Sequence, residues 1–220
     1  MDKKQVLMWY VFVGSVTAFL IYKLGRKSAF GQPATSYDTF KRGKVLITKP
    51  NNDAKTYNVI YVFGGMAYAD KEWMKEQMSK SYFLNNIVVL SNYTDSFSNA
   101  KSELNDFMSQ NDITADKVSL IGFSAGGLNV LANYSKYYKF VGLIDPSNKP
   151  EHLNINFGKN AYMVYNQSNW GSYPNIQANL PKLAKKVAAA DGYANETSMS
   201  HKSIPKYFFE NFADIHRIKN

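Results

Sequence analysis

The residues best suited to chemistry form one short stretch near the middle of the chain. Gly122-Phe123-Ser124-Ala125-Gly126 places a glycine two positions before and two positions after a serine. This spacing allows a serine to occupy a turn too sharp for most residues, because the two glycines let the flanking elements approach closely. A serine held in this way presents its Oγ for attack on a carbonyl. The spacing therefore predicts nucleophilic catalysis by Ser124.

The segments on both sides of this serine provide the structural context for the motif. An apolar run at residues 117–121 predicts a strand, and a helical pattern begins directly after Gly126. The N–H groups at the start of that helix would point to where negative charge develops during acyl transfer. With a strand before it and a helix after it, the segment resembles the nucleophile elbow of the α/β-hydrolase superfamily. The alternative interpretation is a glycine-rich turn that binds a ligand or has no chemical role.

A serine hydroxyl needs a base to remove its proton, and the chain contains three histidines. His201 lies in the polar segment SMSHKS, between the last predicted strand and the last predicted helix. This position also matches the order of nucleophile, acid and histidine along the chain in the superfamily. His216 lies near basic residues at the end of the terminal helix, and His152 is expected to be exposed in a loop. The predicted base is therefore His201.

The third member of such a site orients the imidazole and stabilises its charged form. The commonest arrangement in the superfamily places an acid after the strand predicted at residues 161–165, but residues 166–170 contain no carboxylate. Asp145 ends the preceding strand, where some lipase-like members carry the acid, and it is the predicted partner of the histidine. Alternatively, Asp145 only caps the turn that follows it. Asn169, as a neutral partner, and Asp191 are the other candidates.

The resemblance also implies two backbone donors for the developing oxyanion. One is the Ala125 N–H, directly after the nucleophile. The second is expected from the loop after the strand at residues 57–63, which reads Gly64-Gly65-Met66 where the superfamily often has His-Gly. Glycine lets the backbone approach a substrate, so the Gly65 or Met66 N–H could serve, although this loop could also be a simple tight turn. The chemistry requires no metal and no organic cofactor.

Apolar strands alternate with amphipathic helices along the chain. This alternation predicts an α/β fold with a mostly parallel, doubly wound sheet and helices on both faces, as in α/β-hydrolases. Sites in such sheets lie at the carboxyl ends of the strands, which is where Gly65, Ser124, Asp145 and His201 are expected. The predicted strands are residues 44–48, 57–63, 86–90, 117–121, 140–144, 161–165 and, weakly, 194–199. The predicted helical faces fall within residues 73–82, 100–108, 128–138, 180–187 and 204–215.

Composition narrows the class of protein. The 220 residues suffice for one sizeable core after an apolar N-terminal segment. The absence of cysteine excludes disulfides, thiol catalysis and Cys-based metal sites, and the three histidines lack metal-ligand spacing. The net charge of +9 includes a cluster of Lys and Arg around the N-terminal segment, which suits an anionic membrane surface. No motif with interleaved aromatic and basic residues predicts nucleic-acid binding.

Residues 6–24 read VLMWYVFVGSVTAFLIYKL and predict a single N-terminal transmembrane helix. Aromatic residues near both of its ends and basic residues after it favour a retained anchor over a cleaved signal peptide. The excess of Lys and Arg after the segment predicts a cytoplasmic location for the following domain. The expected organisation is an anchor at residues 1–30, a polar linker at 31–43 and an α/β-hydrolase-like domain at 44–220.

These observations predict a membrane-anchored serine hydrolase of the esterase or lipase kind, with an ester or acyl-lipid substrate. The sequence does not predict an oligomeric state. One alternative is a catalytically degenerate α/β-hydrolase fold that serves as a membrane-tethered structural or interaction module, as the missing acid at residues 166–170 suggests. Another is a peptidase or an acyltransferase on the same scaffold.

Overall fold

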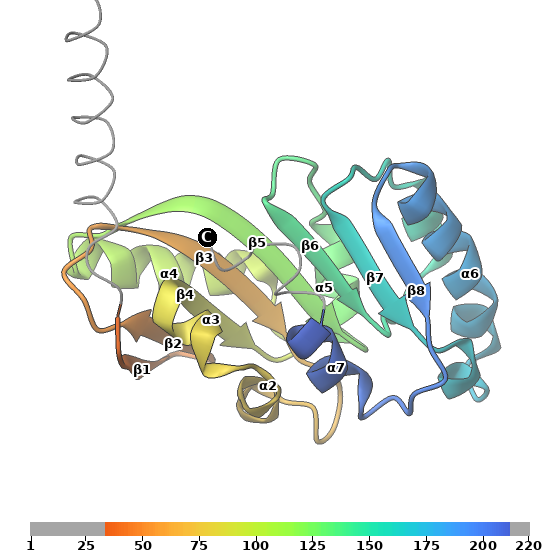
Figure 1. Cartoon of the computed structure of the whole chain (residues 1–220), viewed down its shortest axis with the longest axis horizontal. Helices are drawn as coiled ribbons and strands as arrows, with labels where there is room; N and C mark the ends of the chain where they lie inside the picture. Colours follow the sequence, from red (N-terminus) through yellow and green to blue (C-terminus); the bar gives the residue numbers. More distant parts are fainter. Residues whose placement is uncertain (1–33, 212–220) are drawn as a thin grey trace, which may run out of the picture.

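A mostly parallel, eight-stranded sheet runs through the computed structural model, which describes residues 34–211 (Figure 1). The strand order is β1-β2-β4-β3-β5-β6-β7-β8. Strands β1, β2 and β4 pair antiparallel at one edge, and every later pair is parallel. The predicted α/β fold with a mostly parallel sheet is therefore confirmed.

The elements alternate along the chain from the third strand onward. The strands are β1 (Tyr37–Arg42), β2 (Val45–Pro50), β3 (Thr56–Phe63), β4 (Asn86–Ser91), β5 (Thr114–Phe123), β6 (Phe140–Ile144), β7 (Ala161–Tyr165) and β8 (Tyr193–Glu196). The α-helices are α2 (Lys71–Gln77), α3 (Lys80–Asn85), α4 (Phe97–Gln110), α5 (Gly126–Ala132), α6 (Pro174–Ala189) and α7 (Ile204–Asn211). Two short 3₁₀ helices are η1 (Pro150–Asn154) and η2 (Gln167–Trp170).

Two apolar layers, one on each face of the sheet, form the core. In β4, Ile87 and Val89 face one layer while Val88 and Leu90 face the other, because successive side chains of a strand point to opposite faces. Helices α4, α5 and α6 cover the first face, and α2, α3 and α7 cover the second (Figure 1). Coverage on both faces explains why the central strands are continuous apolar runs.

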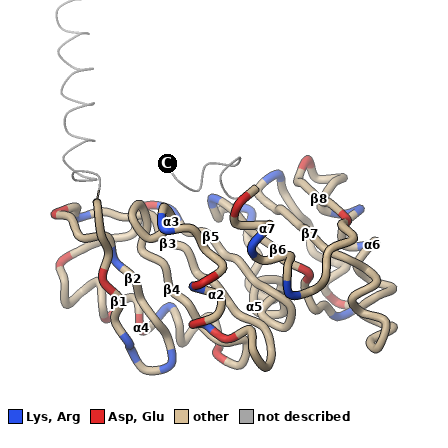
Figure 2. Tube along the Cα trace, turned by 60° about the horizontal axis from the view of Figure 1, so that its bottom comes forward, with Lys and Arg blue, Asp and Glu red and all other residues tan. Residues whose placement is uncertain are grey.

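Charged residues of both signs are interspersed along the described chain (Figure 2). They form exposed ion pairs such as Lys55–Asp112, at 3.1 Å, and Lys206–Glu210, at 3.9 Å. Exposed pairs of this kind contribute at most about 1 kcal/mol each, because water screens them. The two apolar layers therefore account for most of the stability of the sheet.

The polar linker predicted at residues 31–43 is wrong for Tyr37–Arg42. These residues form β1 and pair with β2 along their whole length, from Tyr37 opposite Pro50 to Arg42 opposite Val45. The ring of Phe40 packs against Phe107 at 5.1 Å. An edge strand with one face in water needs few apolar residues, so its sequence resembles that of a linker.

Two helices end earlier than the apolar periodicity predicted. Helix α5 stops at Ala132, and the Tyr134 hydroxyl instead donates to the Asn160 side chain at 2.8 Å and accepts from the Gly158 N–H at 2.7 Å. The helical pattern at residues 73–82 is divided between α2 and α3. Tertiary contacts of single side chains therefore override the local periodicity.

Several predictions concern residues outside the described range of 34–211. The transmembrane segment at residues 6–24 and His216 both fall there. Between residues 34 and 211, none of the helices has the length and apolar character needed to cross a bilayer. The membrane anchor therefore stays a prediction.

Candidate active site

The sharp turn between β5 and α5 holds Ser124 in a left-handed backbone conformation, with φ of +53°. Three backbone hydrogen bonds maintain it. The Ser124 N–H donates to the Ile144 carbonyl at 3.0 Å, and the Ser124 carbonyl accepts from Gly127 at 3.0 Å and from Ser147 at 2.8 Å. A non-glycine residue in this conformation costs about 1–3 kcal/mol, so the surrounding structure must impose it.

The two flanking glycines allow the strand and the helix to lie in direct contact. A Cβ atom on Gly126 would overlap the carbonyl oxygens of Phe63 and Gly64. A Cβ atom on Gly122 would lie 2.6 Å from the Gly126 carbonyl oxygen. Backbone atoms cannot move aside as a flexible side chain can, so both positions require glycine.

His201 and Asp145 are in direct contact although 56 positions separate them in the chain. The distance between His201 Nδ1 and Asp145 Oδ2 is 2.6 Å. Asp145 directly follows β6, and its N–H donates to the Val164 carbonyl of the neighbouring strand β7 at 2.7 Å. His201 lies beyond β8, in the segment that leads into α7. Parallel strands end at the same edge of the sheet, which brings these two segments together.

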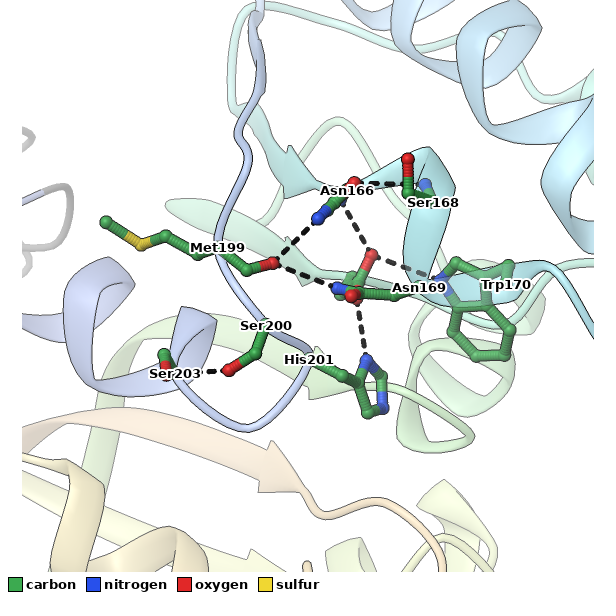
Figure 3. Close-up of polar contacts among 9 residues, drawn as sticks. Asn166, Ser168, Asn169, Trp170, Met199, Ser200, His201 and Ser203 are labelled. Carbon is green, nitrogen blue, oxygen red and sulfur yellow. Dashed lines mark hydrogen bonds and ion pairs between the residues drawn. The ribbon is translucent and has the colours of Figure 1, made fainter.

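The Asp145 carboxylate is fully buried and accepts three further hydrogen bonds. The residues that donate them, Asn166, Asn169 and Trp170, are labelled in Figure 3. Oδ1 accepts from the Asn166 backbone N–H at 3.0 Å and from the Trp170 indole N–H at 3.1 Å. Oδ2 accepts from the Asn169 side-chain amide at 2.8 Å, in addition to its contact with His201. A buried carboxylate is costly unless its oxygens are satisfied, and here each oxygen has two partners.

Two aromatic rings flank the His201 imidazole. The ring of Phe123 lies 4.6 Å away at an interplanar angle of 33°, and the ring of Trp170 lies 5.3 Å away, edge-on at 82°. The His201 side chain keeps 29% of its surface exposed. The imidazole is therefore confined by its neighbours on two sides but remains accessible from a third.

A cavity of about 440 Å³ opens beside this histidine, within the usual range for small-molecule sites. Ser124 and His201 both line it. In residues 34–211 the Ser124 hydroxyl makes no hydrogen bond. The apolar part of the lining comes from Tyr68, Tyr93, Leu128, Trp170, Tyr173 and Ile176. The site can therefore hold a mostly apolar molecule next to a serine and a histidine.

The three backbone groups predicted as oxyanion donors lie around Ser124. Ala125 and Met66 line the cavity, and a Cβ atom on Gly65 would lie 3.0 Å from the Cβ of Ser124. Within residues 34–211, the N–H groups of Ala125, Gly65 and Met66 donate no hydrogen bond. None of these three N–H groups is therefore occupied by an acceptor within residues 34–211.

The other candidate residues lie elsewhere. Asp191 is an exposed residue beyond the end of α6 and does not line the cavity. Asn169 donates to Asp145 rather than contacting the histidine as its neutral partner. No group of three or more His, Asp or Glu residues in the described part of the chain could hold a metal ion.

The expectation of an exposed His152 is wrong, because this residue is 7% exposed. Its Nδ1 accepts a hydrogen bond from the Lys149 N–H at 3.1 Å and so helps to close η1. Burial lowers the pKa of His152, while the nearby Glu151 opposes that shift. The role of His152 is therefore structural: it holds the turn beside Lys149, which lines the cavity.

Sequence reasoning did not identify the residues that surround the acid and the base. Asn166 and Trp170 contact Asp145 and belong to no recognisable motif. Phe123 contacts His201 from within the Gly-x-Ser-x-Gly motif, at a position where the motif specifies no residue type. The sequence signal for Asn166 and Trp170 is the row of hydrogen-bond donors after β7, at the position where an acid is expected.

Comparisons with known proteins identify the class of fold. No known protein family matches the sequence, and no curated protein is recognisably related to it. An uncharacterised protein from Capnocytophaga ochracea has a TM-score of 0.57 at 13% identity, over 84% of this chain and 64% of that chain. The siderophore hydrolase EstA from Aspergillus nidulans gives 0.53 at 9% identity, over 84% and 95%. A methylesterase gives 0.51 at 12% identity, over 89% and 61%.

These similarities concern the fold alone, because the identities are low. They define an α/β-hydrolase-like fold. The chain spans 64% of the length of the Capnocytophaga protein, so that protein contains regions without a counterpart in this match.

Proposed function

We propose that the chain is a serine hydrolase that cleaves carboxylic esters through an acyl-enzyme on Ser124. The observation that carries the proposal is the 2.6 Å contact between His201 and Asp145, beside a cavity that Ser124 and His201 both line. The names of two proteins with the same fold, a siderophore hydrolase and a methylesterase, also support a hydrolase acting on esters.

In the proposed acylation step, the Ser124 Oγ attacks the ester carbonyl. Asp145 engages His201 at Nδ1, which leaves Nε2 free to take the serine proton. The buried Asp145 carboxylate stabilises the imidazolium that forms. His201 then gives the proton to the departing alcohol oxygen as the carbonyl–oxygen bond breaks. The products of this step are the free alcohol and an ester between the acyl group and Ser124.

In the deacylation step, His201 takes a proton from water, which attacks the acyl-enzyme. The acid is released and His201 returns the proton to Ser124. The carbonyl oxygen carries negative charge in both tetrahedral intermediates. The Ala125 N–H and either the Gly65 or the Met66 N–H are the proposed donors to it, since these groups are free beside Ser124.

The lining of the cavity supports an ester with an apolar acyl or alcohol part. The aromatic side chains of Tyr68, Tyr93 and Tyr173 are partly exposed at the cavity, where they could cover such a group. An acyl lipid is the proposed substrate class, because the predicted N-terminal segment would hold the domain near a membrane.

Fluorophosphonate labelling of the detergent-solubilised full chain tests for an activated serine. We expect labelling of wild type and a loss on the order of 10³-fold in rate for His201→Ala, because the general base is removed. His216→Ala is the matched control, with the labelling rate of wild type. Absence of labelling in a folded wild type would contradict the enzyme and favour the catalytically degenerate interaction module. Comparing the products of ester cleavage, amide cleavage and acyl transfer then distinguishes an esterase from a peptidase or an acyltransferase.

We also propose that residues 6–24 anchor the protein in a membrane with the domain on the cytoplasmic side. The full chain is expected to stay in the membrane pellet after extraction at alkaline pH, because an apolar helix is released only by detergent. Protease added outside intact cells should leave the domain uncleaved, because the membrane would separate the two. Release of the chain by alkaline extraction would show that residues 6–24 do not span the membrane.

A further inference from the structure

One short loop supplies three of the four hydrogen-bond donors to the Asp145 carboxylate. Figure 3 labels the three loop residues, Asn166, Asn169 and Trp170. The donors are the Asn166 backbone N–H, the Asn169 amide and the Trp170 indole, all from the five residues that follow β7. The Asn166 side chain stabilises this loop by accepting from the Ser168 N–H at 2.9 Å. The position of the acid therefore depends on a loop that carries no charged side chain of its own.

The same loop also holds the segment that carries the histidine. The Met199 carbonyl, two residues before His201, accepts from the Asn166 side-chain amide at 2.8 Å and from the Asn169 side-chain amide at 3.2 Å. Asn169 Nδ2 thus donates to two groups, Asp145 Oδ2 and the Met199 carbonyl. Because an amide nitrogen carries two hydrogens, a single side chain can make both contacts.

We propose that Asn169 is a positioning residue that fixes the acid and the histidine relative to each other. Asn169 donates to Asp145 Oδ2, the oxygen that also contacts His201. This hydrogen bond restricts rotation of the Asp145 carboxylate. The contact of Asn169 with Met199 restricts the histidine segment at the same time. This inference rests on the proposed function for its effect on rate, since a displacement of about 1 Å in a catalytic group can lower the rate 10²-fold.

Position 169 requires a hydrogen-bond donor, which an ionised carboxylate cannot supply. Aspartate has nearly the shape of asparagine, but in its ionised form it only accepts hydrogen bonds. An aspartate at position 169 would place a second negative charge against the buried Asp145, and two such carboxylates favour retention of a proton. If the side chain at position 169 only filled space, asparagine and aspartate would serve equally well there.

The test compares Asn169→Ala and Asn169→Asp with Gln167→Ala in the full chain. Gln167 is the matched control because its amide lies in the same loop but donates to the Gln177 carbonyl at 3.2 Å. We expect kcat for ester hydrolysis to fall about tenfold to a hundredfold in both Asn169 variants, with a smaller change in KM. In Asn169→Asp, the low-pH limb of kcat/KM should also move to higher pH. Gln167→Ala should match wild type in all three quantities.

A second readout does not require activity. A proton shared between His201 Nδ1 and Asp145 Oδ2 at 2.6 Å gives a far-downfield ¹H NMR signal, which should shift or disappear in both Asn169 variants and persist in Gln167→Ala. If wild type cleaves no ester but the signal responds in this way, the positioning role holds and the proposed function is wrong. If wild type is active but the Asn169 variants match Gln167→Ala in kcat, pH profile and spectrum, the positioning role is wrong.

Discussion

The Ser124→Ala variant is expected to lose ester hydrolysis almost completely, by about 10⁶-fold in kcat. Without Oγ no acyl-enzyme can form, and the free N–H groups around the site can then support only slow attack by water. The backbone at position 124 is left-handed for alanine as well as for serine, so the substitution leaves the turn and its cost nearly unchanged. The melting temperature should therefore stay close to that of wild type.

The measurement is the initial rate on 4-nitrophenyl esters, at matched concentrations of folded protein. Ser147→Ala is the matched control, because Ser147 is a buried serine that lines the same cavity. We expect this control to stay within a few-fold of wild type. Equal losses in the two variants, or an unchanged rate in Ser124→Ala, would mean that Ser124 is not the nucleophile.

The Asp145→Asn variant is expected to lose about 10⁴-fold in kcat, as the triad of serine hydrolases requires its acid. Each oxygen of Asp145 accepts two hydrogen bonds, but an amide nitrogen accepts none. In either orientation the new NH₂ group faces two donors. If it takes the Oδ2 position, His201 Nδ1 must accept and Nε2 carries the proton; if it takes the Oδ1 position, His201 keeps its acceptor, but a neutral amide no longer stabilises the imidazolium. We also expect the free energy of unfolding to fall by about 2–4 kcal/mol, because buried donors are left unpaired.

Measuring kcat and denaturant-induced unfolding on the same preparations separates the loss of rate from the loss of stability. Asp191→Asn is the matched control, because Asp191 also has a positive φ, of +57°, but is exposed and does not line the cavity. It removes the same charge from the same kind of backbone position, so its kcat should equal that of wild type. An unchanged kcat in Asp145→Asn would exclude Asp145 as the partner of the histidine.

The central elements of the fold could be predicted because their signals are local. The β-branched run of β4 is apolar on both faces, which indicates a strand covered by helices on both sides. The edges of the sheet lacked this signal. The polar sequence of β1 predicts a linker, because an edge strand that is largely exposed needs few apolar residues. The pairing that makes it a strand comes from β2.

The candidate site likewise combines residues that local sequence predicts with contacts that depend on the fold. The turn at Ser124 could be predicted because two glycines within two residues permit it. Asp145 was one of several possible acids, since its contact with His201 depends on where β6 and β8 lie in the sheet. The sequence offers Asn169 as a partner of the histidine, and only the folded arrangement directs its amide to Asp145 and Met199.

Local sequence patterns are sufficient to predict the alternation of strands and helices, the sharp turn that carries Ser124, and the order of the candidate residues along the chain. These features follow from steric rules and periodicities that act over a few residues. Only the folded chain shows that His201 contacts Asp145 and that one uncharged loop holds the segments of both residues. Those contacts join segments that lie far apart in the chain, and their geometry depends on the strand order and register of the whole sheet.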